Sequence, residues 1–314
     1  HFHSLVGLIQ VLLLKGQVIK AKQECEKVVD FVLEKKLESA TYNMVLSLQL
    51  EIALQLNNLN EADRLADIVL ADFENTISSE SVLYNHVERC VYLANYLIRK
   101  KDLKNARLYF ERALNCHHDY SNPGAELPGV IIDAFIRLVQ AEAGQNEAMD
   151  WRQTAIEFLD EASLETPAGK IAQASLLLSK KAINKARNML TGLIEELRKS
   201  ELKGYLLHAL ILYALTLFGG DEKELAYLMF EEALSTGSDT GAIRVFIEQG
   251  EPLQNMLTEF SKTKRGISCE KYTPGFMGRL QEALEHEYKN SKNQYSHNEP
   301  MMTALHLLKE PLSD

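Results

Sequence analysis

The charged residues that could bind a ligand stand out because they interrupt otherwise apolar helical segments. In the stretch GVIIDAFIRLVQ, residues 129–140, Asp133 and Arg137 lie four residues apart, so a helix would place both on one face. One interpretation is a surface ion pair that stabilises the helix by about 0.2–0.5 kcal/mol. The other is the polar floor of a binding surface, where a few charged groups orient a bound molecule. Which of the two interpretations holds depends on how the neighbouring helices position this one.

The sequence contains no motif for catalysis or metal binding. There is no GxxxxGK[ST] phosphate loop, no HExxH and no GxSxG. His117 and His118 are adjacent, in a segment that we expect to be a loop, and neighbouring side chains point apart on regular backbone. The four cysteines lie far apart and without a CxxC pair: Cys25, Cys90, Cys116 and Cys269. We therefore predict reduced thiols, no metal site, no cofactor of its own and no enzymatic activity.

Composition narrows the possible partners. The net charge of −10 argues against nucleic acid as a partner of this chain, because phosphate binding needs clustered Lys and Arg. No apolar run reaches the roughly 18 residues of a membrane span, so we expect no membrane partner. With the reduced cysteines, this predicts a cytoplasmic protein. The chain opens in mid-pattern and without methionine, so we also expect it to be part of a longer protein.

An internal repeat organises most of the chain. A short loop followed by an alanine recurs six times, at separations of 41, 44, 42, 38 and 40 residues. The alanines are Ala21, Ala62, Ala106, Ala148, Ala186 and Ala226. Seven and eight residues after each alanine, both positions are apolar in every repeat. Twelve residues before it, Ala94, Ala174 and Ala214 supply a second small residue in three repeats.

A period near 40 residues corresponds to two antiparallel helices with short turns, and the two small positions form the tetratricopeptide (TPR) pattern. The predicted fold is therefore all-α: a TPR-like, right-handed superhelix of about six helix pairs with repeats of about 40 residues. An irregular all-helical bundle is the alternative. We assign residues 1–260 to this helical-repeat domain, with a cap at 241–260. Residues 261–314 are expected to form an amphipathic helix, roughly 275–288, and a flexible linker.

The concave surface of such a superhelix is lined by the first helix of each pair. Counting from each alanine selects a set of polar residues in the third to sixth repeats, with Arg99 bordering the same groove. The candidate ligand-binding residues are Glu88, Asn95, Arg99, Asp133, Arg137, Gln140, Ser175 and His208.

The segment GAIRVFIEQGEPLQNML, residues 241–257, carries a more specific signal. Gly241 permits a left-handed cap, Gly250 ends a short helix, and Pro252 suits the first turn of the next helix. Val245, Phe246 and Ile243 would then cover the open edge of the stack. This segment resembles the closing repeat of the MalT-like branch of LuxR-type transcription regulators, which are large ATP-binding proteins. The resemblance covers most of residues 1–260.

The end of the chain supports the same resemblance. Its last residues, EPLSD, match the phrase that opens the helix-turn-helix head of these regulators, at Glu310, Pro311, Leu312 and Ser313. The resemblance implies an ATPase before this region, which would hold ATP, and a DNA-binding head after it. It also implies that a small-molecule inducer or a regulatory protein binds the superhelix and controls self-association of the full-length protein. The rival hypothesis is a TPR scaffold for protein interaction, without a small-molecule ligand.

If Arg137 contacts an inducer, Arg137→Ala should leave folding nearly intact, because a surface pair contributes little to stability. The change should weaken inducer binding by about 1–3 kcal/mol, because it removes a charge-assisted contact. Thermal unfolding and titration calorimetry measure the two effects. Unfolding of the variant would make Arg137 a structural residue, and normal binding would remove it from the groove.

Overall fold

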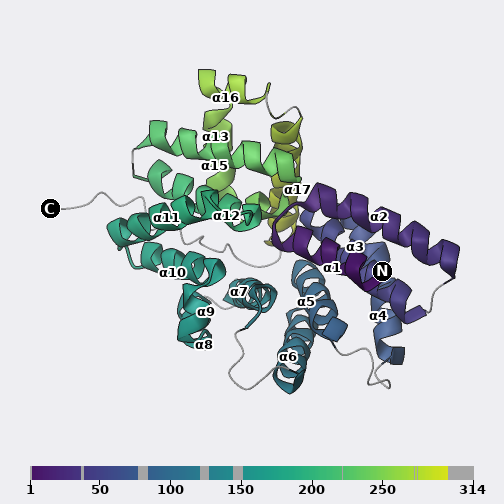
Figure 1. The fold of residues 1–314 in the computed structure, drawn as a ribbon. Coiled ribbons are helices and arrows are strands. Elements are labelled where there is room, and N and C mark those ends of the chain that lie inside the picture. The colour runs from purple at the N-terminus through teal and green to yellow at the C-terminus, as the bar shows by residue number, and fades with distance from the viewer. Residues whose placement is uncertain are drawn as a thin grey trace. The chain divides into compact units, whose positions relative to one another are not determined.

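The computed structural model describes residues 2–36, 39–76, 84–120, 127–143, 151–220, 222–271, 273 and 275–295. Within these ranges every regular element is a helix, as Figure 1 shows. The all-α helical-repeat fold class is confirmed. The right-handed superhelix through all six pairs stays a prediction.

The chain divides into two compact units, His1–Gln173 and Ala174–Asp314, while the boundary expected at residue 260 stays a prediction. The first unit contains α1 (Phe2–Leu14), α2 (Val18–Lys35), α3 (Ser39–Gln55), α4 (Leu59–Thr76), α5 (Tyr84–Arg99), α6 (Leu103–Tyr120), α7 (Gly129–Ala143), α8 (Trp151–Phe158) and α9 (Glu161–Glu165). The helix α10 (Pro167–Ser179) includes the unit boundary. The second unit continues with α11 (Ile183–Arg198), α12 (Lys203–Phe218), α13 (Lys223–Thr240), α14 (Arg244–Ile247), α15 (Glu251–Phe260), α16 (Lys264–Cys269) and α17 (Phe276–Tyr295).

The recurring alanines lie in the second helices of the pairs and are buried. Ala21, Ala106, Ala186 and Ala226 are 0% exposed, and Ala62 is 1% exposed. Ala148 lies outside the described residues. A methyl group is the largest side chain that lets two helix backbones approach closely, so the alanine sets the distance between the two helices of a pair.

The small residues of the first helices and the first apolar position after each described alanine are buried as well, whereas the second apolar position is half-buried at Val29, Leu70 and Leu114. Ala94, Ala174 and Ala214 are 0% exposed. Seven residues after the alanine, the described repeats place a side chain exposed by at most 2%: Val28, Val69, Ala113, Leu193 and Ala233. Most of the periodic positions in the sequence are therefore core positions of the repeats.

The turn inside the helix pair has one conformation in four repeats. Five residues before the alanine, the backbone is left-handed at Gly16 (φ 69°), Asn57 (φ 56°), Lys101 (φ 60°) and Lys181 (φ 57°). In each turn the next amide donates to a carbonyl five residues back, as from Asp102 to Leu97 at 3.0 Å. This is a Schellman cap, and it reverses the chain within a few residues. A lysine in this conformation is unfavourable locally, so the packing of the pair enforces it.

The residue after the alanine reaches from one repeat to the next. Asp63 accepts hydrogen bonds from the Tyr96 hydroxyl at 3.0 Å and from Lys100 Nζ at 3.2 Å. Arg107 Nε donates to Glu142 Oε1 at 2.7 Å in the first unit. In the second unit, Arg187 Nη2 donates to Glu222 Oε2 at 2.9 Å. The charges differ between repeats, but each contact links a second helix to the following pair: Asp63 and Arg107 reach the end of its first helix, and Arg187 reaches the N-cap of its second helix.

The first helices of the first unit lie side by side. Helix α1 contacts α3, α3 contacts α5, and α5 contacts α7. Each second helix also packs against the next first helix, α2 on α3, α4 on α5 and α6 on α7. The first helices are therefore the elements that bring polar residues of successive repeats together.

The segment 241–260 packs against the last helix pair, with α14 and α15 both in contact with α12. Gly241 ends α13 in the left-handed conformation (φ 79°, ψ 3°) and Gly250 precedes α15 at φ 62°, ψ −142°. Phe246 is fully buried, and its ring lies 6.4 Å from that of Phe230 between centroids. Val245 is only half-buried, and Ile247 packs inward with Phe246 instead. The reason is that α14 is a single turn, which presents Phe246 and Ile247 together.

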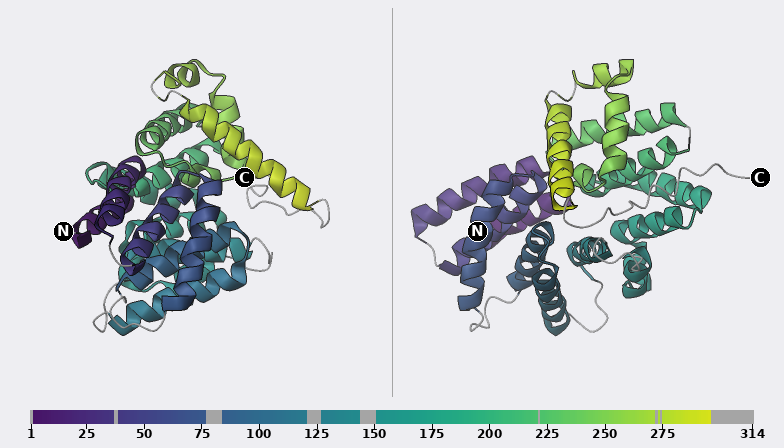
Figure 2. Two further views of the ribbon diagram at one scale, coloured as in Figure 1. Left: turned by 90° about the vertical axis from the view of Figure 1, so that its right-hand side faces the viewer. Right: turned by 180° about the vertical axis from the view of Figure 1, so that it is seen from behind.

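Helix α17, the yellow helix in Figure 2, is longer than expected and reaches Tyr295. Its buried residues are Phe276, Met277, Leu280 and Leu284, and it contacts α13, α14 and α15. Residues 289–295, KNSKNQY, contain neither glycine nor proline, so no helix breaker ends the helix near residue 288. The rest of the expected linker and the residues Glu310, Pro311, Leu312 and Ser313 lie outside the described residues.

The contact between the cap and α17 requires a glycine on α13. A Cβ at Gly237 would lie 2.6 Å from Phe246 Cε2 and 2.9 Å from Phe276 Cζ, and both rings are fully buried. We expect Gly237→Ala to lower the free energy of unfolding by about 1–3 kcal/mol, as overpacking does. Urea unfolding monitored by circular dichroism measures the change.

Gly192→Ala is the matched control, because Gly192 lies within α11 and a Cβ there meets nothing within 4 Å. This change should stabilise the protein by about 0.5–1 kcal/mol, the ordinary effect of alanine in a helix. Equal effects at the two glycines would refute the steric requirement at Gly237.

Candidate functional site

A stripe of polar residues runs along α3. Asn43, Ser47, Glu51 and Gln55 recur every four residues, and the first three are 5%, 2% and 6% exposed. The Ser47 hydroxyl donates to the Asn43 carbonyl at 2.9 Å, and Gln55 Nε2 donates to Glu51 Oε1 at 2.7 Å. A four-residue spacing places these side chains on one face of the helix.

A second polar stripe lies on α5, which contacts α3. Glu88, Tyr92, Asn95 and Arg99 follow one another at intervals of four, three and four residues. Two hydrogen bonds connect this stripe to other repeats. Gln10 of α1 donates to the Glu88 carboxylate, and Asn95 Nδ2 donates to Glu51 Oε2 at 3.5 Å.

These contacts join three repeats into one site. We call the residues that make these hydrogen bonds, together with Tyr92 between Glu88 and Asn95 on α5, the polar cluster: Gln10, Glu51, Gln55, Glu88, Tyr92 and Asn95. Asn95 also has an unused acceptor, because its Oδ1 is buried and accepts no hydrogen bond within the described part of the chain. The polar cluster is the candidate binding site.

Burial controls the electrostatics of the polar cluster. It raises the pKa of the Glu88 carboxyl, while the hydrogen bond from Gln10 opposes the rise. Burial also raises the pKa of the Tyr92 hydroxyl well above its ordinary value, and the nearby carboxyls of Glu88 and Glu51 add to the effect. Tyr92 is therefore a neutral hydroxyl at physiological pH.

Five of the residues selected from the sequence are half-buried on two helices that contact each other, α5 and α7, and their role in binding stays a prediction. Glu88 and Asn95 belong to the polar cluster, and Arg99 is half-buried one turn further along α5. On α7, which contacts α5, Asp133 and Arg137 are half-buried.

The remaining three candidate residues lie further along α7 or in the second unit. Gln140 is exposed near the end of α7. Ser175 lies on α10 and His208 on α12, both half-buried and both in the second unit. That these two share a groove with the others stays a prediction.

Of the six residues in the polar cluster, the sequence-based candidates include only Glu88 and Asn95. Gln10, Glu51 and Gln55 belong to the first two repeats, outside the third to sixth repeats in which the groove was expected, and Tyr92 was not among the candidates. The four-residue spacing of Asn43, Ser47, Glu51 and Gln55, in a segment whose one other polar residue is Gln49, was a signal that could have found the stripe on α3.

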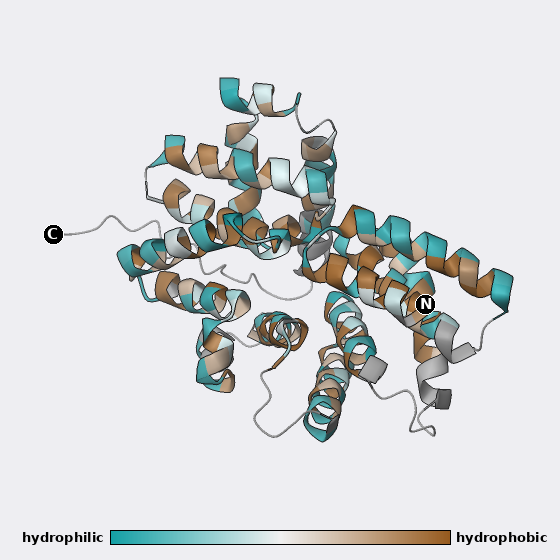
Figure 3. Ribbon diagram, in the orientation of Figure 1, coloured by the Kyte–Doolittle hydropathy of each residue, from teal (hydrophilic) through white to brown (hydrophobic). Residues whose placement is uncertain are grey.

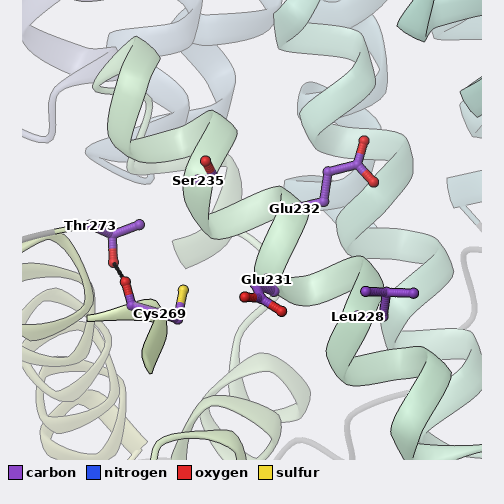
Figure 4. A pocket seen from close by; sticks show the side chains of 6 residues that line it. All are labelled: Leu228, Glu231, Glu232, Ser235, Cys269 and Thr273. Carbon is purple, nitrogen blue, oxygen red and sulfur yellow. Dashed lines mark hydrogen bonds between the residues drawn. The ribbon is translucent and has the colours of Figure 1, made fainter. Parts of the chain in front are cut away.

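A pocket in the second unit is a weaker candidate. It has a volume of about 420 Å³, and Figure 4 shows its lining residues, Leu228, Glu231, Glu232, Ser235, Cys269 and Thr273. Both carboxylates are already bound: Arg265 pairs with Glu231, and Arg198 Nε donates to Glu232 Oε1 at 2.9 Å. Burial raises the pKa of the Cys269 thiol, which therefore stays protonated and is a poor nucleophile.

The two adjacent histidines lie in a helix, and the expectation of a loop was wrong. His117 and His118 belong to the last turn of α6. The first is 9% exposed and the second is exposed, so the rings point in different directions, with centroids 6.1 Å apart. Within the described ranges no group of three or more His, Cys, Asp or Glu side chains could hold a metal ion.

The helix pairs, the buried alanines and the polar first helices define a helical-repeat protein of the tetratricopeptide type. The chain belongs to the MalT-like TPR region family, whose model matches residues 2–263. Membership indicates a regulatory sensor or protein-interaction domain, and no enzymatic family is indicated. No relative was found among curated proteins. Among the described helices, none has the length and apolar content to cross a membrane.

The raised pKa of Glu88 makes stability depend on pH. A carboxyl whose pKa is higher in the folded state contributes stability that is fully present below the unfolded-state pKa of about 4.3. That contribution is lost as the pH rises through the folded-state pKa. Glu88→Gln keeps an oxygen that accepts from Gln10 and removes the ionisation. The variant should therefore gain stability relative to the parent as the pH rises through this window.

Urea unfolding at pH 4 to 8 tests this. Glu111→Gln, which removes a charge from the exposed side of α6, corrects for the change in net charge. A stability difference between Glu88→Gln and the parent that is independent of pH would contradict the raised pKa.

Proposed function

We propose that this region is the signal-sensing domain of an ATP-dependent LuxR-type transcription activator, and that its effector binds at the polar cluster. The family membership supports the sensing role. The resemblance of residues 241–257 and of Glu310–Ser313 to such activators supports the rest. The effector is a small-molecule inducer or a regulatory protein.

The observation that carries the proposal is the polar cluster, in which Glu51 and Tyr92 are buried and the other residues are half-buried. Glu51 and Glu88 each accept a hydrogen bond from another repeat. A buried polar group without a partner, in contrast, costs about 1–3 kcal/mol. Asn95 Oδ1 is such a group in the described residues. A bound molecule that donates a hydrogen bond to this oxygen would remove the cost. A ligand with a hydrogen-bond donor at this position would therefore bind more tightly than one without it.

The position of the polar cluster also supplies a mechanism for signalling. Its hydrogen bonds connect α1, α3 and α5, the first helices of three successive repeats. An effector that contacts Asn95 and Glu51 therefore touches two repeats at once. It favours whichever arrangement of the repeats fits it best and shifts the population toward that arrangement. In the full-length protein this shift would control self-association.

The other candidate residues extend this site. Arg99, Asp133, Arg137 and Gln140 would supply charged and polar contacts along α5 and α7. Ser175 and His208 remain candidates on the second unit.

This region has no catalytic role and no cofactor of its own in our proposal. In such an activator ATP is held by a separate ATPase and DNA by a separate helix-turn-helix head. We place the protein in the cytoplasm, without a membrane partner.

A thermal-shift screen of polar metabolites against the 314-residue chain tests the proposal. A compound that binds the folded state raises the melting temperature, and at 100 times its Kd it stabilises by about 2.7 kcal/mol. The same compound should raise the melting temperature of Asn115→Ala, a change on the exposed face of α6, but not that of Asn95→Ala.

Two outcomes would reject parts of the proposal. Stabilisation only by a peptide or protein would favour the TPR scaffold without a small-molecule ligand. A compound that stabilises Asn95→Ala as well as the parent would place the effector away from the polar cluster.

A further inference from the structure

The polar cluster contains two carboxylates and no basic side chain. Glu51 accepts hydrogen bonds from Gln55 and Asn95. Glu88 accepts one from Gln10, so all three donors are neutral amides. Within the described residues, neither carboxylate forms an ion pair with a lysine or an arginine. The polar cluster therefore presents negative charge that no basic side chain of the described structure neutralises by direct contact.

The groups of the polar cluster that lack a partner can both accept a hydrogen bond. Asn95 Oδ1 is buried and accepts none within the described ranges. Tyr92 is 5% exposed, and its hydroxyl lies near both carboxyls without a hydrogen bond to any described residue. An ammonium group has three donors and no acceptor, whereas a hydroxyl group brings acceptors as well. A cation with N–H donors therefore matches both the charge and the open acceptors.

The two carboxylates lie at opposite ends of one row of residues on α5. Glu88 begins the row, and Asn95, which donates to Glu51, ends it. The seven residues between them correspond to about 10 Å along the helix axis. Tyr92 lies between the two ends, and in Figure 3 hydrophilic teal recurs among the brown segments of α5. A ligand that contacts both carboxylates therefore needs two separated positive charges.

A linear diamine has the length that this row requires. With five methylene groups between its nitrogens, it is about 7 Å long when extended, by the geometry of an extended chain. Each ammonium group reaches an acceptor over about 3 Å more. Such a molecule can therefore bridge the two ends of the row.

We propose that the effector recognised at the polar cluster is a linear aliphatic diamine or polyamine. One ammonium group binds Glu51 and the open Asn95 Oδ1, and the other binds Glu88. The Tyr92 hydroxyl accepts a further hydrogen bond between them. This inference rests on the proposed function, because it names the chemical class of the effector for the same site.

Titration calorimetry of the 314-residue chain with cadaverine, a diamine of five carbons, tests the proposal. Pentylamine, pentanediol and glutarate have the same number of carbons, with one ammonium group, two hydroxyl groups and two carboxylates. We expect saturable binding of cadaverine and binding of pentylamine that is about tenfold weaker or more, because one charge-assisted contact is missing. Pentanediol and glutarate should not bind. Magnesium ion, which carries the same charge as cadaverine, should not displace it.

Two variants locate the contacts. Glu51→Gln and Glu88→Gln each remove one charge and keep an oxygen that accepts the amide hydrogen bonds. Each should weaken cadaverine about tenfold or more, and in Glu88→Gln the advantage of cadaverine over pentylamine should disappear. Glu111→Gln is the matched control, because it removes a charge from the exposed side of α6 and should leave affinity unaltered. Circular dichroism melting verifies that all three variants fold.

Several results would overturn the proposal. They are no binding of cadaverine to the unaltered chain, equal affinity for pentylamine, and equal weakening in Glu111→Gln, which would mean counter-ion attraction only. Binding of pentanediol or glutarate that Asn95→Ala abolishes would reject the diamine class and leave the polar cluster as the effector site. Cadaverine binding that is unchanged in folded Glu51→Gln and Glu88→Gln would reject the polar cluster itself.

Discussion

The close approach of two helices at a buried alanine is the constraint on which the rest of the structure depends. Wherever the alanine is described, it is at most 1% exposed, so any larger side chain would separate the helices of its pair. The left-handed residue five positions earlier reverses the chain at the distance that this contact needs. Four turns reach that conformation with three different residue types, at Gly16, Asn57, Lys101 and Lys181. The packing contact therefore dictates the turn, and local preference does not.

The same contact explains why polar residues are buried in the first helices. Once each pair is closed, α3 has neighbours on several sides and little of its surface reaches solvent. Glu51 therefore meets Asn95 of the next repeat, and Glu88 meets Gln10 of an earlier one. The cost of burying these groups is reduced because each has a partner from another repeat. In the sensing role that we propose, such a site would respond to the spacing between repeats.

A stack of repeats needs a polar or covered face where it ends. After α13 the apolar edge is covered by aromatic packing, with the rings of Phe246 and Phe276 5.7 Å apart between centroids. Gly237 of α13 makes room for both rings, because a Cβ there would lie within 3 Å of each.

The sequence by itself determined the helical class, the repeat period, the buried alanines and the cap, because each depends on local spacing or on the backbone freedom of single residues. Gly241 and Gly250 could be assigned for that reason. Only the tertiary structure decided which polar faces meet. Glu51 and Asn95 are 44 residues apart, and their contact depends on how packing rotates α3 against α5. Such a rotation follows from many weak contacts summed across two repeats, and no local pattern encodes that sum.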